Sequence, residues 1–380
     1  MQKLEDLEIS PAELADRLEG GDDLQVLDVR APHRLASGTV EAEDFFNVKG
    51  SDIMGLADPA SAGLDPSRPI AVVCGHGHAS MTVTQFLRHK GWPAVSLRGG
   101  VTAWMSLLRQ RVLSQPDGVD EFIQFDRIGK GSLGYLIISG DEALAVDTSR
   151  DWPQWREAAR EHGADLVGVA DTHAHADFIS GGPQLAAELD VPYYLNAADA
   201  VYPYDGTRGR IEFESVEEGD TISVGRATLH VHQTPGHTEG SVCYRIADDA
   251  ILTGDFLFIA SIGRPDLAGK TDEWAGLLWN SLTRARATWP KQSVIYPAHY
   301  SSDAERNSDL SVGREFDDLL ETNPALAIED ETAFREFVGG GVKTPPDAYR
   351  IIKAINVGLT SVAPEEAEVL EAGKHECALG

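Results

Sequence analysis

The chain has 380 residues, of which 42% are hydrophobic, and its 61 acidic and 32 basic side chains give a formal net charge of −29. A charge of this sign repels phosphate backbones and anionic lipids, which excludes nucleic acids and membrane surfaces as expected partners. The length is too great for one ordinary domain and predicts two.

Three cysteines, Cys74, Cys243 and Cys377, are too few and too widely spaced for a disulfide framework or a C-x-x-C zinc site. The longest apolar stretches, such as 135–138, fall far short of the roughly 18 residues of a membrane span. The first six residues lack the apolar core of a signal peptide. We therefore expect a cytoplasmic protein whose cysteine chemistry, if any, depends on a single thiol.

Residues 8–110 alternate short apolar strands with a helical stretch: strands at 24–28, 70–74 and 94–97, and a helix at 80–90. This alternation predicts a parallel α/β sheet. Residues 112–120 carry several turn formers and no periodicity, which is typical of a linker. We predict a first domain at 1–111, a linker at 112–119 and a second domain at 120–380.

The second domain contains strands in two runs with helices between them. The expected strands are 133–139, 143–147, 166–170, 228–233, 242–246, 250–253 and 293–296, and the expected helices are 152–161, 184–189 and 274–288. The pair 133–139 and 143–147 flanks Gly140-Asp141, which favours a hairpin. The pattern fits two packed sheets with helices outside, and residues 305–380 read as mostly helical.

A candidate nucleophile, Cys74, ends one apolar strand and begins the loop Gly75-His76-Gly77-His78-Ala79, just before the helix that starts near Ser80. Converging backbone N–H groups and the positive end of the helix dipole stabilise a thiolate or a persulfide at such a place. His76 and His78 are expected to contact the substrate, and they add basicity that weakens above pH 6 to 7. The alternative is a buried structural cysteine.

Histidine and aspartate residues follow four apolar strands of the second domain at the points where the strands end. They occur in Thr172-His173-Ala174-His175-Ala176-Asp177, in Thr234-Pro235-Gly236-His237, in Thr253-Gly254-Asp255 and in Tyr296-Pro297-Ala298-His299. Imidazole and carboxylate are the usual ligands of catalytic zinc and non-haem iron. One such residue is easily a loop polar group, but four together predict a metal site.

These segments resemble the metallo-β-lactamase superfamily, whose signature is H-x-H-x-D-H with later His, Asp and His ligands. The resemblance is closest to the persulfide dioxygenase branch, related to glyoxalase II, on 234–238, 253–255, 263–266 and 296–299, and on Asn323-Pro324 and Phe337-Val338 in the tail. It implies an αββα sandwich and a mononuclear ferrous site of His173, His237 and Asp255.

The same resemblance assigns supporting roles to other polar residues. His175, Asp177 and His299 would orient the ligands through hydrogen bonds, or serve as alternative ligands. Asp147, which ends a strand, either joins them or forms a simple turn. Arg264 either pairs with a carboxylate of the thiol substrate through its planar fork or pairs within the protein.

The sequence departs from the superfamily pattern at Phe178, where the pattern has a histidine that helps to hold a second metal. A phenyl ring ligates nothing, so a binuclear zinc site should be weakened or lost. This favours a one-metal dioxygenase over a glyoxalase II type thioesterase.

Residues 8–110 resemble a rhodanese domain. Leu27-Asp28-Val29-Arg30 is similar to its early strand motif, residues 74–79 to its active loop, and Leu97-Arg98-Gly99-Gly100-Val101-Thr102-Ala103-Trp104 to its closing motif. The loop lacks the arginine common at the position of Ala79, which puts thiosulfate as the sulfur donor in doubt.

Four further residues are expected to have no part in the site. His230 and His232 alternate along one strand and are predicted on its exposed face. Cys243 is predicted in the core, and Cys377 receives no role.

Together, the two resemblances predict oxygen-dependent oxidation of a low-molecular-weight thiol persulfide to sulfite, with one Fe²⁺ per chain and sulfane-sulfur transfer through Cys74. Two alternatives stay open: a binuclear zinc thioester or lactone hydrolase, because ligand types alone do not separate iron from zinc, and a non-enzymatic sulfur carrier or sensor. The expected partners are the thiol persulfide and dioxygen, and the sequence leaves homo-oligomer formation undecided.

Overall fold

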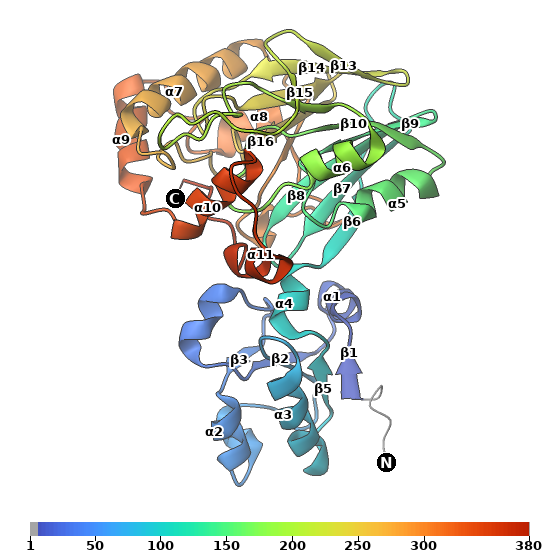
Figure 1. Ribbon diagram of the computed structural model, residues 1–380. Helices are drawn as coiled ribbons and strands as arrows, with labels where there is room; N and C mark the ends of the chain where they lie inside the picture. The colour runs from blue at the N-terminus through green and yellow to red at the C-terminus, as the bar shows by residue number, and fades with distance from the viewer. Residues whose placement is uncertain (1–6, 380) are drawn as a thin grey trace. The chain divides into compact units, whose positions relative to one another are not determined.

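A computed structural model describes residues 7–379, so the ends of the two predicted domain ranges, residues 1–6 and 380, lie outside the described residues. The chain divides into two compact units (Figure 1). The first contains the described residues up to Leu108 together with Arg127–Lys130 and Ala372–Lys374, and the second contains the other described residues from Arg109 onward. Among the described residues, none of the helices combines the length and apolar character needed to cross a bilayer.

The first unit is built on a five-stranded parallel sheet, as the sequence predicts. The strand order is β1 (Glu8–Ile9), β5 (Ala94–Leu97), β4 (Ile70–Val73), β2 (Gln25–Asp28) and β3 (Phe45–Asn47). Its α-helices are α1 (Pro11–Glu19), α2 (Gly50–Gly55), α3 (His78–His89) and α4 (Gly100–Met105), with 3₁₀ turns at Pro32–Ser37 and Pro59–Ala62.

Alternating side chains of this sheet enter two different apolar cores. Ala71 and Val73 of β4 belong to one buried cluster, whereas Ile70 and Val72 belong to the other. Successive side chains of a strand point to opposite faces, so both faces of the sheet are covered. This explains why β4 is a continuous apolar run. Cys74 directly follows Val73, so it lies at the carboxyl end of this central strand.

The second unit contains two sheets. The seven-stranded sheet has the order β12 (Glu214–Ser215), β11 (Tyr193–Leu195), β10 (Asp165–Ala170), β9 (Glu142–Val146), β8 (Ser132–Ser139), β7 (Glu121–Arg127) and β6 (Leu108–Val112). The six-stranded sheet runs β13 (Thr221–Val224), β14 (Ala227–Gln233), β15 (Val242–Ile246), β16 (Ala250–Gly254), β17 (Val294–Pro297) and β18 (Arg314–Glu315). The expected hairpin is confirmed, because β8 and β9 pair antiparallel with Ser139 opposite Glu142.

Helices flank the two sheets of this unit. They are α5 (Pro153–Glu161), α6 (Gly182–Leu189), α7 (Thr271–Thr288), α8 (Phe316–Thr322), α9 (Glu331–Gly341), α10 (Asp347–Asn356) and α11 (Pro364–Leu370), with a 3₁₀ turn at Asp303–Glu305. The first two pack on the seven-stranded sheet (Figure 1). One core cluster joins Tyr135 and Leu144 of the seven-stranded sheet, Leu229 and Leu252 of the six-stranded sheet, and Leu278 of α7. The unit is therefore the predicted αββα sandwich.

The segment 112–119, predicted as a linker, lies in the second unit. Val112 ends β6, an outer strand of the seven-stranded sheet, and Leu113 donates its backbone N–H to the Phe122 carbonyl of β7 at 2.8 Å. The turn formers Pro116, Asp117 and Gly118 thus connect two strands of one sheet, and the compact units divide at Leu108, before the predicted boundary. Residues 116–118 do form a turn, but the strands on either side of it, β6 and β7, are neighbours in one sheet, and this places the turn in the second unit.

Candidate metal centre

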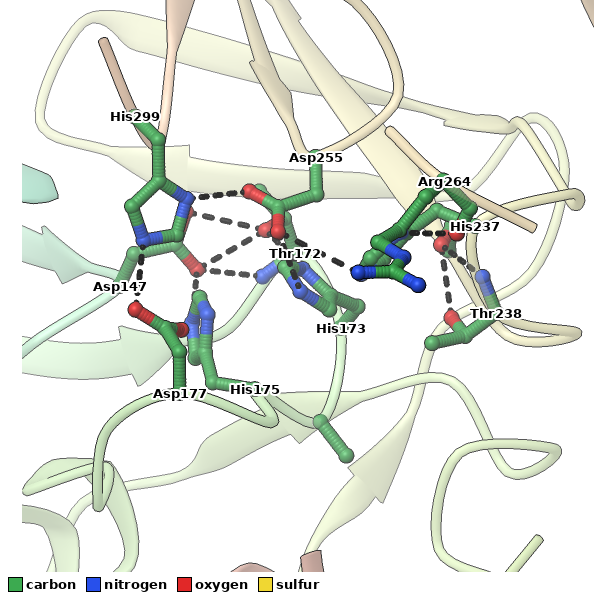
Figure 2. Close-up of polar contacts among 12 residues, drawn as sticks. Asp147, Thr172, His173, His175, Asp177, His237, Thr238, Asp255, Arg264 and His299 are labelled. Atoms are coloured by element: carbon green, nitrogen blue, oxygen red, sulfur yellow. Dashed lines mark hydrogen bonds and ion pairs between the residues drawn. The ribbon is translucent and has the colours of Figure 1, made fainter. Parts of the chain in front are cut away.

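The histidine and aspartate residues that the sequence places at four strand ends meet at one point of the second unit. His173, His175 and Asp177 follow β10, and the other three residues, His237, Asp255 and His299, follow β14, β16 and β17 respectively. All six are at most 1% exposed. Figure 2 shows them drawn together around Asp255.

Three ligand atoms converge within this group. Asp255 Oδ2 lies 3.6 Å from His173 Nε2 and 3.4 Å from His237 Nε2. Two ligand atoms on one tetrahedral cation, each about 2.1 Å from it, are about 3.4 Å apart. None of the three atoms has a hydrogen-bond partner. The spacing thus fits a metal held by two histidines and one carboxylate.

Hydrogen bonds on the far side of each imidazole ring fix which nitrogen faces the centre. His173 Nδ1 lies 3.0 Å from Thr172 Oγ1, and that hydroxyl itself donates to Asp147. His237 Nδ1 lies 3.0 Å from the carbonyl oxygen of Arg264. Both Nδ1 atoms are therefore donors, which leaves the Nε2 lone pairs directed at the centre.

The protonation states of the three residues agree with this arrangement. Burial lowers the pKa of His237 to about 3, and burial together with the charge of His175 lowers the pKa of His173. Burial alone would raise the pKa of Asp255, but the charge of His299 holds it well below its usual range. Three buried acceptors thus face one another with no proton between them, an arrangement that a cation satisfies.

His299 is placed as a charged bridge between two carboxylates. Its Nδ1 lies 2.7 Å from Asp255 Oδ1 and its Nε2 lies 3.1 Å from Asp177 Oδ2 (Figure 2). Burial lowers its pKa, but the two carboxylates outweigh burial and raise it to about 10. As an imidazolium it donates to both partners, and it holds Asp255 so that only Oδ2 faces the three-atom centre.

Asp147 ties the strand end of β9 to the histidine loop. Its carboxylate accepts from the Thr172 backbone N–H at 2.7 Å and lies 3.1 Å from His175 Nε2. Its backbone φ of 53° lies in the left-handed region, which costs free energy for a residue other than glycine. Burial lowers the pKa of His175, but the carboxylates of Asp147, Asp171 and Asp255 together outweigh burial and raise it. Asp147 therefore positions the loop rather than only ending a strand.

Phe178 fills the position at which the superfamily pattern has a histidine. Its ring stacks on His175 with centroids 4.1 Å apart and meets the His299 ring edge-on at 6.2 Å. The side chain is 1% exposed. An apolar ring therefore occupies the space beside Asp177 and His299.

The structure shows Arg264 in the second of its two expected roles. Its guanidinium is 2% exposed and donates twice to Asp266 at 2.6 Å, with further bonds to backbone carbonyls of the tail. This pairing occupies the planar fork, which is not available to a substrate carboxylate in this conformation. The part of Arg264 that touches the centre is its carbonyl oxygen, which holds His237.

The cysteine loop of the first unit joins β4 to α3, and Cys74 is buried in it. Cys74 Sγ accepts from the Ser80 backbone N–H at 3.2 Å in the first turn of α3, and the side chain is 4% exposed. Val101 and Thr102 donate their backbone N–H groups to the carbonyls of Cys74 and Gly75 at 2.8 and 3.1 Å. The closing motif at 97–104 therefore holds the loop in place through these two backbone hydrogen bonds.

Gly100 permits the close approach of these two segments. Its φ is 63°, and a Cβ on it would lie 2.3 Å from the Cys74 carbonyl oxygen. His76 and His78 are both exposed on the loop, and His76 Nδ1 lies 3.2 Å from Thr102 Oγ1. Their contact with a substrate stays a prediction.

Residues predicted to stand outside the site do so, with one exception. His230 and His232 lie on the partly exposed face of β14, and Cys243 is fully buried in the core. Cys377, which received no role, lies beside Asp177 and His299. The sequence also missed Lys353 and Asn356 of α10, which donate to carbonyls of the histidine loop. The only signal for Cys377 was the alternation His375-Glu376-Cys377 close to the end of the chain.

Comparisons with known proteins agree with the fold and the site. Residues 128–308 match the metallo-beta-lactamase superfamily, and residues 10–107 match the rhodanese-like domain. A metallo-beta-lactamase from Staphylococcus aureus subsp. aureus COL is similar with a TM-score of 0.56 and 27% identity, over 64% of this chain and 73% of that one. The crystal structure of ETHE1 from Myxococcus xanthus, at 23% identity and a TM-score of 0.50 over 66% of this chain and 98% of that one, shows the same fold.

Relatives in sequence include both hydrolases and a dioxygenase. The probable metallo-hydrolase YqgX of Bacillus subtilis (strain 168) is 31% identical, over 43% of this chain and 83% of the relative. The hydroxyacylglutathione hydrolase of Maricaulis maris (strain MCS10) is 34% identical over 59% and 80%. The mitochondrial persulfide dioxygenase ETHE1 of Bos taurus is 32% identical over 44% of this chain, and the match spans 64% of that relative.

Fold and site thus define an enzyme of the metallo-hydrolase class with a metal centre at the strand ends of a two-sheet sandwich. The chain belongs to the metallo-β-lactamase superfamily and carries an N-terminal rhodanese-like domain.

Proposed function

We propose that this chain oxidises a low-molecular-weight thiol persulfide to sulfite with dioxygen, at one ferrous ion held by His173, His237 and Asp255. The observation that carries the proposal is the convergence of their three buried acceptor atoms without a proton between them. Two histidines and one carboxylate are the protein ligands of non-haem Fe(II) oxygenases. The persulfide dioxygenase among the relatives supports the same reaction.

The proposed reaction balances without a further reductant. One persulfide, one dioxygen and one water give one thiol, one sulfite dianion and two protons. The outer sulfur loses four electrons, and these reduce dioxygen. Iron, when bound, supplies the redox chemistry and Lewis acidity for this exchange.

The residues of the chain fix the ligands, hold a proton and exclude water. Thr172 and the Arg264 carbonyl orient the two imidazoles, and His299 orients the carboxylate. His299 also holds a proton on Nδ1, 2.7 Å from Asp255 Oδ1, so that the carboxylate faces the centre through Oδ2 alone. The near-complete burial of the ligands keeps bulk water from the centre and strengthens each electrostatic interaction there.

The first unit is proposed to handle sulfane sulfur before or after the oxidation. Cys74 would carry an outer sulfur as a persulfide, stabilised by the Ser80 backbone N–H in the first turn of α3. A small thiol that takes this sulfur regenerates the Cys74 thiol and becomes the thiol persulfide. The step exchanges one sulfur–sulfur bond for another and needs no oxidant.

A metal-dependent hydrolase is the second candidate, because the hydroxyacylglutathione hydrolase relative is 34% identical over 80% of its length. In that reading two zinc ions would activate water for attack on a thioester. Phe178, in the place of a histidine of the second metal position, favours the dioxygenase.

Oxygen uptake separates the two candidates. Protein loaded anaerobically with iron, or with zinc, would be given glutathione persulfide in an oxygen electrode and S-lactoylglutathione in a hydrolysis assay. We expect the iron form to consume one dioxygen per sulfite released, His237→Ala to abolish uptake, and His230→Ala on the outer face of β14 to preserve it. Thioester hydrolysis by the zinc form without oxygen uptake by the iron form would overturn the proposal.

A further inference from the structure

A buried tyrosine directly follows the charged bridge His299. Tyr300 is 3% exposed, and each of its polar groups is hydrogen-bonded. Its backbone N–H donates to the Gly131 carbonyl at 3.1 Å, and its carbonyl accepts from His375 Nε2 at 2.9 Å. His375 also stacks on His299, with ring centroids 4.3 Å apart and an interplanar angle of 24°. The chain is therefore fixed at the residue after His299.

The phenol of Tyr300 is held by a buried ion pair. Its hydroxyl donates to Asp126 Oδ1 at 3.0 Å, and Arg306 Nη1 donates to Asp126 Oδ2 at 2.7 Å. Arg306 Nη2 donates to the Tyr300 hydroxyl, and the guanidinium carbon lies 4.4 Å from the ring centroid. A second guanidinium, that of Arg111, lies 3.6 Å from Asp126 Oδ2. The Asp126 side chain is fully buried and that of Arg306 is 7% exposed. Asp126 thus fixes the hydroxyl, and Arg306 fixes the ring.

Stability alone does not explain a charged network at this place. Apolar residues of similar volume often stabilise a fold as well as a buried ion pair does, because the two charges lose their hydration on burial. A hydrogen-bonded ion pair nevertheless fixes direction as well as distance, since each hydrogen bond has a preferred angle. The residue whose direction is fixed here is the one next to His299.

The placement of His299 has to be precise because its ring donates to two carboxylates at once. Nδ1 lies 2.7 Å from Asp255 Oδ1, and Nε2 lies 3.1 Å from Asp177 Oδ2. A displacement of the ring by about 0.5 Å away from Asp255 would lengthen the first bond beyond its normal range. Asp255 would then be free to turn and present both oxygens to a metal, instead of Oδ2 alone.

We propose that Tyr300, held by Asp126 and Arg306, is a positioning residue of the metal centre. It sets the imidazolium of His299 and, through it, the single oxygen that Asp255 presents. Asp126 lies in β7 and Arg306 directly follows the 3₁₀ turn Asp303–Glu305, so the network ties the segment after β17 to two other elements. The inference rests on the metal site proposed above, whichever reaction that site catalyses.

Cobalt(II) as the only added metal tests the proposal, because the intensity of its visible bands falls as its coordination number rises. Full-length Tyr300→Phe keeps the ring and loses the hydroxyl. We expect it to bind cobalt about tenfold more weakly in chelator competition. Its visible bands should also be weaker, because a carboxylate that binds through both oxygens adds a ligand atom. Asp126→Asn should act in the same way, and the double variant should bind no more weakly than the weaker single variant, since both changes remove one contact.

Tyr296→Phe is the matched control, because Tyr296 is a buried residue of β17 whose hydroxyl makes no hydrogen bond to another described residue. It should leave the affinity and the bands unchanged. If Tyr300→Phe does not fold, Arg306→Lys takes its place, because it keeps the charge beside Asp126 but loses the planar contact with the ring.

Two results would overturn the positioning role: a Tyr300→Phe protein that matches the parent, or one that binds cobalt more weakly with unchanged bands. A parent that binds no cobalt would contradict the metal centre itself and, with it, this inference. Cobalt binding needs neither dioxygen nor persulfide, so the outcome is independent of whether the centre oxidises persulfides.

Discussion

At the scale of single residues, hydrogen bonds to the Nδ1 atoms of His173 and His237 leave the Nε2 lone pairs of both rings free to bind a metal. Thr172 is the clearest case, because its hydroxyl accepts from His173 Nδ1 and donates to Asp147. Nothing in the motif Thr172-His173 marks the threonine as different from any other strand-end residue. Thr172 matters because its hydroxyl holds His173 Nδ1, so that His173 Nε2 faces the centre.

Thr172→Val should lower metal affinity by about 10–100-fold, because valine keeps the volume but cannot fix the His173 tautomer. Thr148→Val is the control, since Thr148 is equally buried in the same unit and its hydroxyl has no hydrogen-bond partner. Competition with a chelator under anaerobic conditions measures both affinities. Equal affinities would show that the tautomer is fixed by something else.

The lowered pKa values of the ligands predict how metal binding depends on pH. Burial lowers the pKa of His237 to about 3 and lowers that of His173, so these imidazoles remain unprotonated below pH 6.5, where an exposed histidine gains a proton. Protons should therefore begin to compete with zinc only well below pH 6.5. Zinc affinity measured by chelator competition between pH 8 and pH 5 should stay nearly flat. A fall of about tenfold or more per pH unit that begins at pH 6.5 would contradict the burial argument.

At the scale of elements, α10 holds the histidine loop in place. Asn356 Nδ2 donates to the carbonyls of His175 and Phe178 at 2.9 Å each, and Asn356 Oδ1 accepts from the Ser180 backbone N–H at 3.0 Å. One amide side chain thus satisfies three buried backbone groups of the loop. Helix α10 is therefore part of the centre, although it contributes no ligand.

Asn356→Ala should lower the free energy of unfolding by about 2–4 kcal/mol, because it leaves three buried backbone groups without partners. It should also weaken metal binding, since the loop carries His173. Ile351→Ala on the same helix is the control, because Ile351 is 42% exposed. Denaturant unfolding of the metal-free protein gives the stability change. A loss below 1 kcal/mol would mean that water replaces the amide.

The sequence predicts the ligands better than their surroundings, and the reason is physical. In the sequence, strands such as β10 and β16 are recognisable as runs of apolar residues. The local pattern alone therefore places a histidine or aspartate just beyond them at the end of a strand. Asn356 and Cys377 come from the tail, and only tertiary packing brings them to the loop after β10. Strands β6 and β7 were also missed, because they are stabilised by pairing in the sheet. This pairing places the turn residues 116–118 in the second unit.

At the scale of the whole molecule, one chain carries both proposed centres. The Cys74 loop is held by hydrogen bonds within the first unit, and the three-acceptor centre lies within the second unit. A common chain raises the effective concentration of a product of one centre near the other. The fusion is therefore expected to matter for sulfur delivery and not for the oxidation itself.

Cys74→Ser should abolish oxygen uptake when the protein receives a sulfane-sulfur donor and a small thiol. Uptake should remain nearly intact with preformed glutathione persulfide, because the proposed iron centre lies in the other unit. The contrast between the two substrates is measured in one oxygen electrode. Equal loss with both substrates would assign Cys74 to the oxidation or to folding, and no loss with either would leave the first unit as a binding module.

Metal analysis of the full-length chain purified without oxygen tests the central claim most directly. The three unpaired acceptors predict about one iron per chain, lost in Asp255→Ala because only two neutral donors then remain, and retained in Cys377→Ser. An Asp255→Ala protein that keeps its iron, or a native chain that binds none under these conditions, would contradict the assignment of this centre.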